Sequence, residues 1–216
     1  MYVAIEGVIG VGKTTLARLL QPRFEADLLL EVFEENPFLS DFYADRQRYA
    51  FQTQIFFLLS RYRQQNNTVP RILAAGRSLL ADYTFAKDAL FAGINLHGDE
   101  LTMYERVHEA LGEKIQKPDL VVYLQADTDV LMQRIALRDR SYERQIERAY
   151  IDELNGAYDK FFAKTFDHTP ALTIPTSKLE FVHNPEHLAY IENRIRESLG
   201  ILPFQPSLPL GDTQGG

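Results

Sequence analysis

Along the chain, short runs of apolar residues alternate with longer stretches in which apolar residues recur three and four positions apart. The short runs predict buried strands at residues 2–5, 28–30, 78–82, 120–124 and 171–174. The longer stretches predict helices at residues 13–20, 40–65, 84–92, 101–111, 130–138, 150–162 and 185–199. This alternation is typical of an α/β fold with a five-stranded parallel sheet flanked by helices. We expect one domain over residues 1–200, followed by a Pro- and Gly-rich disordered tail at 201–216.

A glycine-rich turn joins the first strand to the first helix and reads G-x-x-x-x-G-K-T from Gly7 to Thr14. Backbone N–H groups can wrap a phosphate chain closely only where side chains are absent, and the helix that opens at Lys13 points its positive end at the anion. Lys13 supplies a mobile cation for the outer phosphates, and the Thr14 hydroxyl suits a magnesium ion. The turn therefore predicts a P-loop that binds a phosphate chain and is made of Gly7, Val8, Ile9, Gly10, Val11, Gly12, Lys13, Thr14 and Thr15.

Acidic residues follow two of the predicted strands. In open parallel sheets, ligands bind beyond the carboxyl ends of the strands. Glu31 follows the second strand and is a candidate general base; an equally good interpretation is a solvated loop acid, since Glu34 and Glu35 follow closely. Asp82 ends the third strand, where it can face a metal near Thr14 or cap the next helix, and these two roles are compatible.

The helix predicted at residues 40–65 combines an apolar face with a few polar side chains. Gln54 and Arg61 are seven residues apart, two turns along one face, and Tyr43 lies further upstream. A polar stripe on such a helix suggests a ligand with hydrogen-bonding edges. An ordinary exposed face is the alternative, and it would be preferred if the P-loop were absent.

A basic segment ends the helix predicted at residues 130–138, with arginines at positions 134, 138 and 140. Guanidinium groups at this spacing can converge on one polyanion, and guanidinium is the preferred planar partner of phosphate oxygens. The alternative is a solvated helix end, where basic residues complement the helix dipole. Arg144 and Arg148 stand among acidic residues, so part of the segment is expected to be an ion-paired surface.

The composition excludes several kinds of protein. The net charge of −7 argues against a general polyanion binder, although it leaves room for a local basic site. The chain has no cysteine, which excludes disulfides, thiolate catalysis and zinc–thiolate sites and fits a reducing cytoplasm. No apolar run approaches the about 18 residues that span a bilayer, and the first strand begins at the N-terminus. We therefore expect neither a membrane span nor a signal peptide.

Taken together, these motifs resemble those of the deoxynucleoside kinase family, and most nearly those of bacterial deoxyguanosine and deoxyadenosine kinases. The resemblance spans about residues 2–199 and rests on the P-loop and on residues 31–39, 51–54, 81–83 and 134–140. It implies a P-loop three-layer fold with an arginine-rich lid. It also implies a kinase that moves the γ-phosphoryl group of Mg-ATP, or of a similar triphosphate, to the 5′-hydroxyl of a deoxynucleoside. The resemblance alone implies that a purine deoxynucleoside is the preferred acceptor.

The resemblance implies roles on the acceptor side by matched position. Glu31 would take the proton from the nucleoside 5′-hydroxyl, and Tyr43 and Glu143 would hold the sugar 3′-hydroxyl. Gln52 is a rival to Gln54 for contact with the base and ranks second because of its spacing. The residues that would read the nucleobase edge are then Gln54, Arg61 and Asp88.

On the donor side, the resemblance implies a lid of arginines that closes over the phosphates. Its members would be Arg134, Arg138 and Arg140, of which Arg138 and Arg140 would join Lys13 and Glu31 as catalytic residues. Magnesium would be held by Thr14 and Asp82.

The segment Asp82-Tyr83-Thr84 departs from the family's pattern, because many relatives carry Glu-Arg-Ser or Asp-Arg-Ser there. The acid is kept and the arginine is lost. Residues 76–78 mimic the motif, but they would begin the strand and would spoil the six-residue spacing from Asp82 to Asp88. We therefore place the motif at Asp82. What stabilises the acceptor side stays open, with a lid arginine as one candidate.

Two other functions stay open from the sequence. A nucleoside monophosphate kinase of the same broad fold would need an extra cation for the acceptor's phosphate, and Arg61 is the only strong candidate. A nucleotide switch would need no second small-molecule pocket, so the polar stripe argues against it. We expect no nucleic-acid or membrane partner. The apolar helices near residues 50–62 and 101–111, together with the resemblance, predict a homodimer or a heterodimer with a related kinase.

Overall fold

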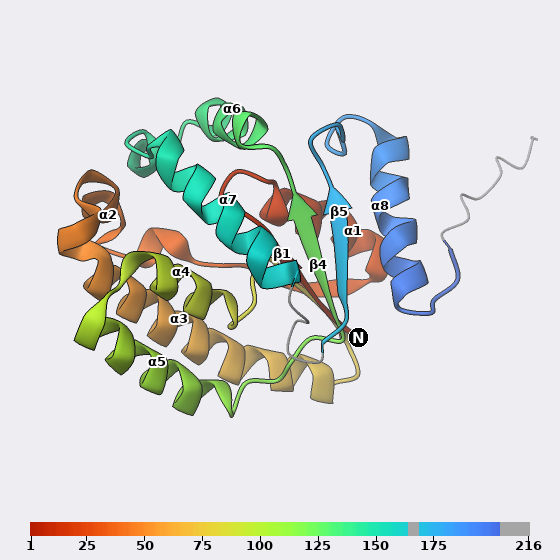
Figure 1. Ribbon diagram of the computed structural model, residues 1–216. Coiled ribbons are helices and arrows are strands. Elements are labelled where there is room, and N and C mark those ends of the chain that lie inside the picture. The colour runs from red at the N-terminus through yellow and green to blue at the C-terminus, as the bar shows by residue number, and fades with distance from the viewer. Residues whose placement is uncertain (164–168, 204–216) are drawn as a thin grey trace, which may run out of the picture.

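One parallel sheet organises the protein (Figure 1). The structure, a computed structural model, describes residues 1–163 and 169–203. Within these residues the sheet has the strand order β2-β3-β1-β4-β5, and every neighbouring pair is parallel. The strands are β1 (Tyr2–Glu6), β2 (Ala26–Leu29), β3 (Ser78–Ala81), β4 (Leu120–Gln125) and β5 (Ala171–Pro175). The predicted five-stranded α/β fold is confirmed, and the strand ends differ from the predicted ones by at most two residues.

Helices cover both faces of the sheet. In the described residues they are α1 (Lys13–Phe24), α2 (Leu39–Ala44), α3 (Arg46–Ala74), α4 (Lys87–Asn95), α5 (Gly98–Gly112), α6 (Thr128–Arg138), α7 (Arg148–Ala163) and α8 (Pro185–Ser198). Two 3₁₀ turns, η1 (Phe33–Glu35) and η2 (Ser141–Glu143), lie in the connections. Figure 1 shows α1 and α8 on one side of the sheet and α7 with the α3–α5 group on the other, which makes three layers.

The central strand β1 shows why the first residues of the chain are apolar. All of its residues are buried, because β3 and β4 flank it and helices cover both of its faces. Val3 and Ile5 pack in the same hydrophobic cluster as α1 and α8, whereas Tyr2 and Ala4 pack with Val69 of α3 on the opposite face. Alternate residues of a strand point to opposite faces, so a strand enclosed on both sides needs an uninterrupted apolar run.

The long helix predicted at residues 40–65 is two helices. The chain leaves helical geometry at Asp45 (φ −146°, ψ 81°), whose carboxylate accepts a hydrogen bond from the Arg48 N–H at 3.2 Å and caps α3. From there α3 runs to Ala74 and includes Pro70. The prediction missed the break because the apolar periodicity continues across it, and it ended the helix too early because residues 66–69 are mostly polar.

The helix predicted at residues 84–92 is displaced toward the C-terminus. Helix α4 begins at Lys87 and continues to Asn95, so it includes Gly93, which lies just beyond the end of the predicted helix. The segment before it is held by the buried carboxylate of Glu6, which accepts hydrogen bonds from the N–H (2.6 Å) and the hydroxyl (2.8 Å) of Thr84. This anchoring holds the residues near Thr84 outside the helix, which begins at Lys87.

The carboxyl ends of β1, β2 and β3 lie at the same edge of the sheet, because these strands are parallel neighbours. The P-loop follows β1, Glu31 comes two residues after β2, and Asp82 follows β3 directly. The sheet therefore brings together three chain segments that are far apart in the sequence.

In the part of the chain that the structure describes, no helix is both long enough and apolar enough to cross a bilayer. The tail predicted at residues 201–216 lies mostly outside the described residues, which end at position 203.

Candidate active site

The P-loop takes the form that its glycines require. Gly7 and Gly12 have φ of +145° and +104°, a region that side chains disfavour. A Cβ at Gly7 would lie 2.5 Å from the carbonyl oxygen of Leu124, and one at Gly12 would lie 2.9 Å from the ring of Phe181. Neighbouring residues therefore leave no room for a side chain at Gly7 or Gly12. Helix α1 begins directly after the loop, at Lys13.

The Lys13 side chain lies back against the P-loop. Its ammonium donates hydrogen bonds to the carbonyl oxygens of Gly7 at 2.7 Å and Val8 at 3.2 Å. Burial and the nearby charge of Lys87 lower the pKa of Lys13 to about 8. The negative charge of a phosphate group would stabilise the ammonium, so this site favours an anion.

Thr14 and Asp82 form the pair that the sequence predicted for a metal. The Thr14 hydroxyl donates a hydrogen bond to Asp82 Oδ2 at 2.5 Å, and Asp82 is 2% exposed. Burial raises the pKa of the Asp82 carboxyl, and the charge of Glu31 adds to this effect. A hydroxyl and a buried carboxylate beside a phosphate loop fit Mg²⁺, which binds through one or two protein ligands together with phosphate oxygens and water.

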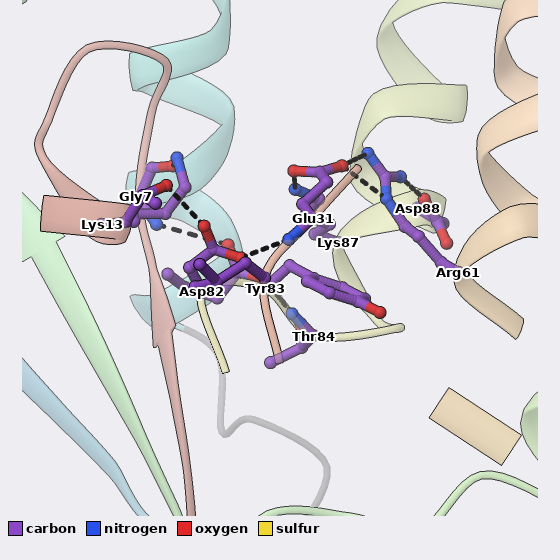
Figure 2. Close-up of polar contacts among 12 residues, drawn as sticks. Gly7, Lys13, Glu31, Arg61, Asp82, Tyr83, Thr84, Lys87 and Asp88 are labelled. Carbon is purple, nitrogen blue, oxygen red and sulfur yellow. Dashed lines mark hydrogen bonds and ion pairs between the residues drawn. The ribbon is translucent and has the colours of Figure 1, made fainter. Parts of the chain in front are cut away.

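Glu31 is held by two cations, one at each carboxylate oxygen (Figure 2). Arg61 donates to Glu31 Oε1, through Nε at 2.7 Å and also through Nη2. Lys87 donates to Glu31 Oε2 at 2.7 Å. Burial raises the pKa of the Glu31 carboxyl, but the charges of Arg61 and Lys87 outweigh it and hold that pKa well below its usual range.

The backbone also fixes Glu31 against the metal pair, because the Glu31 N–H donates to Asp82 Oδ1 at 2.7 Å. Figure 2 shows Asp82 between Lys13 and Glu31, with Arg61 and Asp88 beyond Glu31. This order runs from the phosphate side of the site to the side predicted to read a base.

On that side, Arg61 pairs with a second acid, Asp88, which is fully buried. Gln54 lies two turns before Arg61 on α3, is 2% exposed and lines the same cavity as Glu31. Among the described residues, the Gln54 side-chain oxygen has no hydrogen-bond partner. A buried amide oxygen without a partner indicates a ligand that donates a hydrogen bond there. Gln52 is exposed.

Tyr43 and Glu143 reach the cavity from α2 and from η2. Burial raises the pKa of the Tyr43 hydroxyl well above its usual range, and Glu143 contributes to this rise. Arg138 binds Glu143 through two hydrogen bonds of 2.9 and 2.6 Å, and Arg140 lies 3.7 Å from the same carboxylate. Both arginines line the cavity, beside the predicted sugar residues.

Arg134 lies elsewhere. Its guanidinium donates to the carbonyl oxygens of Val11 at 3.2 Å and Thr176 at 3.0 Å, and it is not among the residues that line the cavity. It ties the P-loop to the segment that follows β5. Asp88 also stands behind the cavity wall, where it contacts Arg61.

The cavity thus collects most of the predicted residues in one place. Its lining includes Ile9, Gly10, Gly12, Lys13, Thr14, Thr15, Glu31, Tyr43, Gln54, Arg61, Asp82, Arg138, Arg140 and Glu143. It also includes Lys87, which the sequence interpretation missed. Tyr83 stands where many family members carry an arginine, and this difference was the signal in the sequence for another cation nearby.

Comparison with known proteins agrees with this geometry. Residues 3–199 match the model of the family described as "Deoxynucleoside kinase". The deoxyguanosine kinase of Bacillus subtilis (strain 168) is 33% identical over 199 residues, which cover 91% of this chain and 96% of that protein. The deoxyadenosine kinase of Dictyostelium discoideum is 33% identical over 200 residues, covering 92% of this chain and 80% of that one.

Solved structures show the same fold. The deoxyadenosine kinase of M. mycoides with bound dATP superposes with a TM-score of 0.78 at 23% sequence identity, covering 91% of this chain and 99% of that one. At this sequence identity the similarity shows the fold, and it extends along most of the chain.

Proposed function

The chain belongs to the deoxynucleoside kinase family, and on this premise we propose that it transfers the γ-phosphoryl group of ATP to the 5′-hydroxyl of a deoxynucleoside. The observation that carries the proposal is the position of Glu31. Its carboxylate lies in the cavity that the P-loop also lines and is bound by Arg61 of α3, and its backbone N–H is bound to Asp82. A base placed between a phosphate site and a second small-molecule pocket suits a hydroxyl acceptor.

Different residues bind the donor phosphates and the acceptor hydroxyl. Lys13 and the P-loop N–H groups bind the donor phosphates, and Glu31 orients the 5′-hydroxyl and accepts its proton as the phosphoryl group moves in line. A magnesium ion at Thr14 and Asp82 would neutralise charge on the phosphates. Because the pKa of Glu31 is low, the carboxylate orients the hydroxyl and receives its proton late, so electrostatic stabilisation supplies most of the catalysis.

We place the sugar between Tyr43 and Glu143, and the base beside Gln54 and Arg61. The Glu143 carboxylate is bound by Arg138, so a sugar that contacts Glu143 also meets the arginine assigned to the donor phosphates. Arg138 and Arg140 are the proposed lid residues, and they would exchange part of their contact with Glu143 for phosphate oxygens when both substrates are bound. Arg134 serves this lid by fixing the P-loop.

A purine deoxynucleoside is the proposed acceptor. Relatives that cover most of this chain are named deoxyguanosine kinase and deoxyadenosine kinase, and one is named deoxyadenosine/deoxycytidine kinase. The partnerless oxygen of Gln54 accepts from an amino or imino group, which guanine, adenine and cytosine all present.

A coupled phosphorylation assay tests the proposal. It compares deoxyguanosine, deoxyadenosine, deoxycytidine, thymidine and their monophosphates, with Mg-ATP and with ATP plus a chelator. We expect turnover on purine deoxynucleosides that is lost without magnesium. Turnover on monophosphates alone would reassign the acceptor site, and ATP hydrolysis that ignores every acceptor would favour a nucleotide switch.

We also propose that the protein is a cytoplasmic homodimer that pairs through α3 and α5. Leu59 on α3 and Met103 on α5 are each 47% exposed, and the two helices lie side by side at one end of the molecule (Figure 1). Large apolar side chains at such exposure on adjacent helices are suited to an interface. A heterodimer with a related kinase would use the same surface.

A further inference from the structure

Tyr83 stands at the position of the family's missing arginine, and its side chain cannot bind the phosphates. Tyr83 is fully buried, and its hydroxyl donates a hydrogen bond to Gln64 Oε1 at 2.6 Å. Its ring packs in the hydrophobic cluster formed by β1, β3 and the end of α3. Tyr83 therefore points into the layer between the sheet and α3, away from the P-loop.

Lys87 supplies a cation close by, four residues further along the chain. It is the first residue of α4, is 4% exposed, and its ammonium lies 2.7 Å from Glu31 Oε2. The same ammonium lies 5.7 Å from the centre of the Tyr83 ring and 5.9 Å from that of Phe91. A buried ammonium is costly unless it is paired, so the pairing with Glu31 and the two rings fixes where this charge stands.

The position of this charge is also favourable for the donor phosphates. Lys87 lines the same cavity as Lys13, and its charge contributes to lowering the Lys13 pKa, which places the two ammonium groups within electrostatic reach of each other. Two cations that face one cavity repel until an anion enters between them. A phosphoryl group that passes from the P-loop toward Glu31 crosses this space.

Lys87 has hydrogen-bonding capacity left for such a group. An ammonium carries three N–H donors, and the hydrogen bond to Glu31 uses one of them. Arg61, the other cation on Glu31, binds the opposite oxygen and is also paired with Asp88 on the base side. Of the two, Lys87 is the one placed toward the P-loop.

Resting on the proposed kinase reaction, we propose that Lys87 is a catalytic residue that replaces the missing arginine. Its ammonium holds Glu31 Oε2 and donates to an oxygen of the γ-phosphoryl group in transfer. The bond from the γ-phosphorus to the β,γ-bridging oxygen breaks, the bond to the nucleoside 5′-oxygen forms, and the 5′-hydroxyl proton passes to Glu31. Lys87 keeps its protons and stabilises the charge that spreads over the equatorial oxygens.

The first test separates turnover from nucleoside binding. We expect Lys87→Met to lower kcat at least 100-fold while the nucleoside dissociation constant, measured by calorimetry, changes less than about fivefold. Lys87→Arg, which restores a cation, should keep kcat within about tenfold of wild type. The control is Lys114→Met, since Lys114 is exposed on the segment after α5. A kcat for Lys87→Met close to that of wild type would overturn the proposal.

The second test asks whether charge or packing matters, and it uses the absence of cysteine from the chain. In Lys87→Cys the new thiol is unique, and 2-bromoethylamine converts it to a side chain that ends in an ammonium at nearly lysine's reach. Alkylation with 1-bromopropane gives a neutral side chain of similar length. We expect aminoethylation, checked by intact mass, to raise kcat at least tenfold and propylation to leave it low. Equal recovery with both reagents would assign Lys87 a packing role, and recovery with neither would overturn the role proposed for the ammonium.

Wild-type turnover separates failure of this inference from failure of the proposed function. If wild type phosphorylates no deoxynucleoside, the kinase proposal itself is wrong. If wild type is active and the cation at position 87 is dispensable, only the role of Lys87 is wrong.

Discussion

At the scale of single residues, the site depends on how one carboxylate is held. Glu31 receives a cation on each oxygen and is anchored through its N–H to Asp82. This arrangement fixes the direction of both lone-pair sets and keeps the carboxylate ionised. The residue is therefore better suited to orienting a hydroxyl than to removing a proton early.

Replacing Glu31 by glutamine tests this interpretation. Glu31→Gln keeps the side chain's size but removes the charge that Arg61 and Lys87 bind, so we expect kcat to fall by about 100-fold or more. Nucleoside affinity, measured by calorimetry, should stay within a few-fold. Glu35→Gln makes the same chemical change at an exposed position of η1 and serves as the control. A near-normal kcat for Glu31→Gln would remove Glu31 from this role.

His108 gives a prediction about pH and stability. Its ring stacks on Phe85 with centroids 4.6 Å apart, and burial lowers its pKa below the ordinary 6.5. At a pH between the folded and the unfolded pKa of His108, the unfolded chain binds more protons than the folded one. The contribution of neutral His108 to stability is therefore fully present above pH 6.5 and is lost as the pH falls below it. We expect His108→Phe to flatten the decline in unfolding free energy between about pH 7 and pH 5.5. Parallel profiles for the two proteins would show that another group causes the decline.

At the scale of elements, two helices connect the base side of the site to the phosphate side. Helix α3 places Gln54 and Arg61 two turns apart on one face, and α4 starts with Lys87 and Asp88 in succession. Arg61 joins Asp88 of α4 to Glu31, which follows β2. A shift of α4 along its axis would therefore move contacts on both sides of Glu31.

Gly93 in α4 offers a way to test the stability of this helix. It is exposed, its φ is not positive, and a Cβ would meet nothing within 4 Å. Alanine loses less backbone entropy than glycine in a helix, so Gly93→Ala should raise the free energy of unfolding by about 0.5–1 kcal/mol. Denaturant titration measures it. Gly7→Ala is the contrast, because its Cβ would clash with a backbone oxygen; equal effects at the two positions would contradict the geometry.

At the scale of the whole molecule, the parallel sheet makes the site and the outer helices make the proposed dimer. The P-loop, Glu31 and Asp82 meet because β1, β2 and β3 end at one edge. Helices α3 and α5 lie at one end of the molecule, and each presents an exposed apolar side chain there.

The dimer prediction uses these two side chains. The double variant Leu59→Glu, Met103→Glu should sediment as a monomer at micromolar concentration, whereas wild type should sediment as a dimer, because buried carboxylates without partners are costly at an interface. Leu137→Glu alters another leucine, 78% exposed on α6, and should leave the dimer intact. Sedimentation of the wild type as a monomer would contradict the proposed interface.

The order of strands and helices and the P-loop follow from the amino-acid sequence alone. Hydrophobic periodicity is a local property, and G-x-x-x-x-G-K-T names backbone positions that only glycine can occupy without strain, as Gly7 and Gly12 illustrate. The acids at the strand ends, Glu31 and Asp82, were also predictable, since parallel topology brings the carboxyl ends of strands together. The roles proposed for them stay predictions.

Other features depend on contacts between distant parts of the chain and could not be predicted from a local pattern. The break at Asp45 lies inside a continuous apolar periodicity, and the cap that causes it depends on one side-chain direction. Arg134 carries the same side chain as Arg138, yet it binds backbone carbonyls because the segment after β5 passes beside it. Lys87 became a candidate only when folding brought it to Glu31, which lies 56 residues earlier in the chain. Contacts between distant residues depend on packing, and packing is a property of the assembled layers.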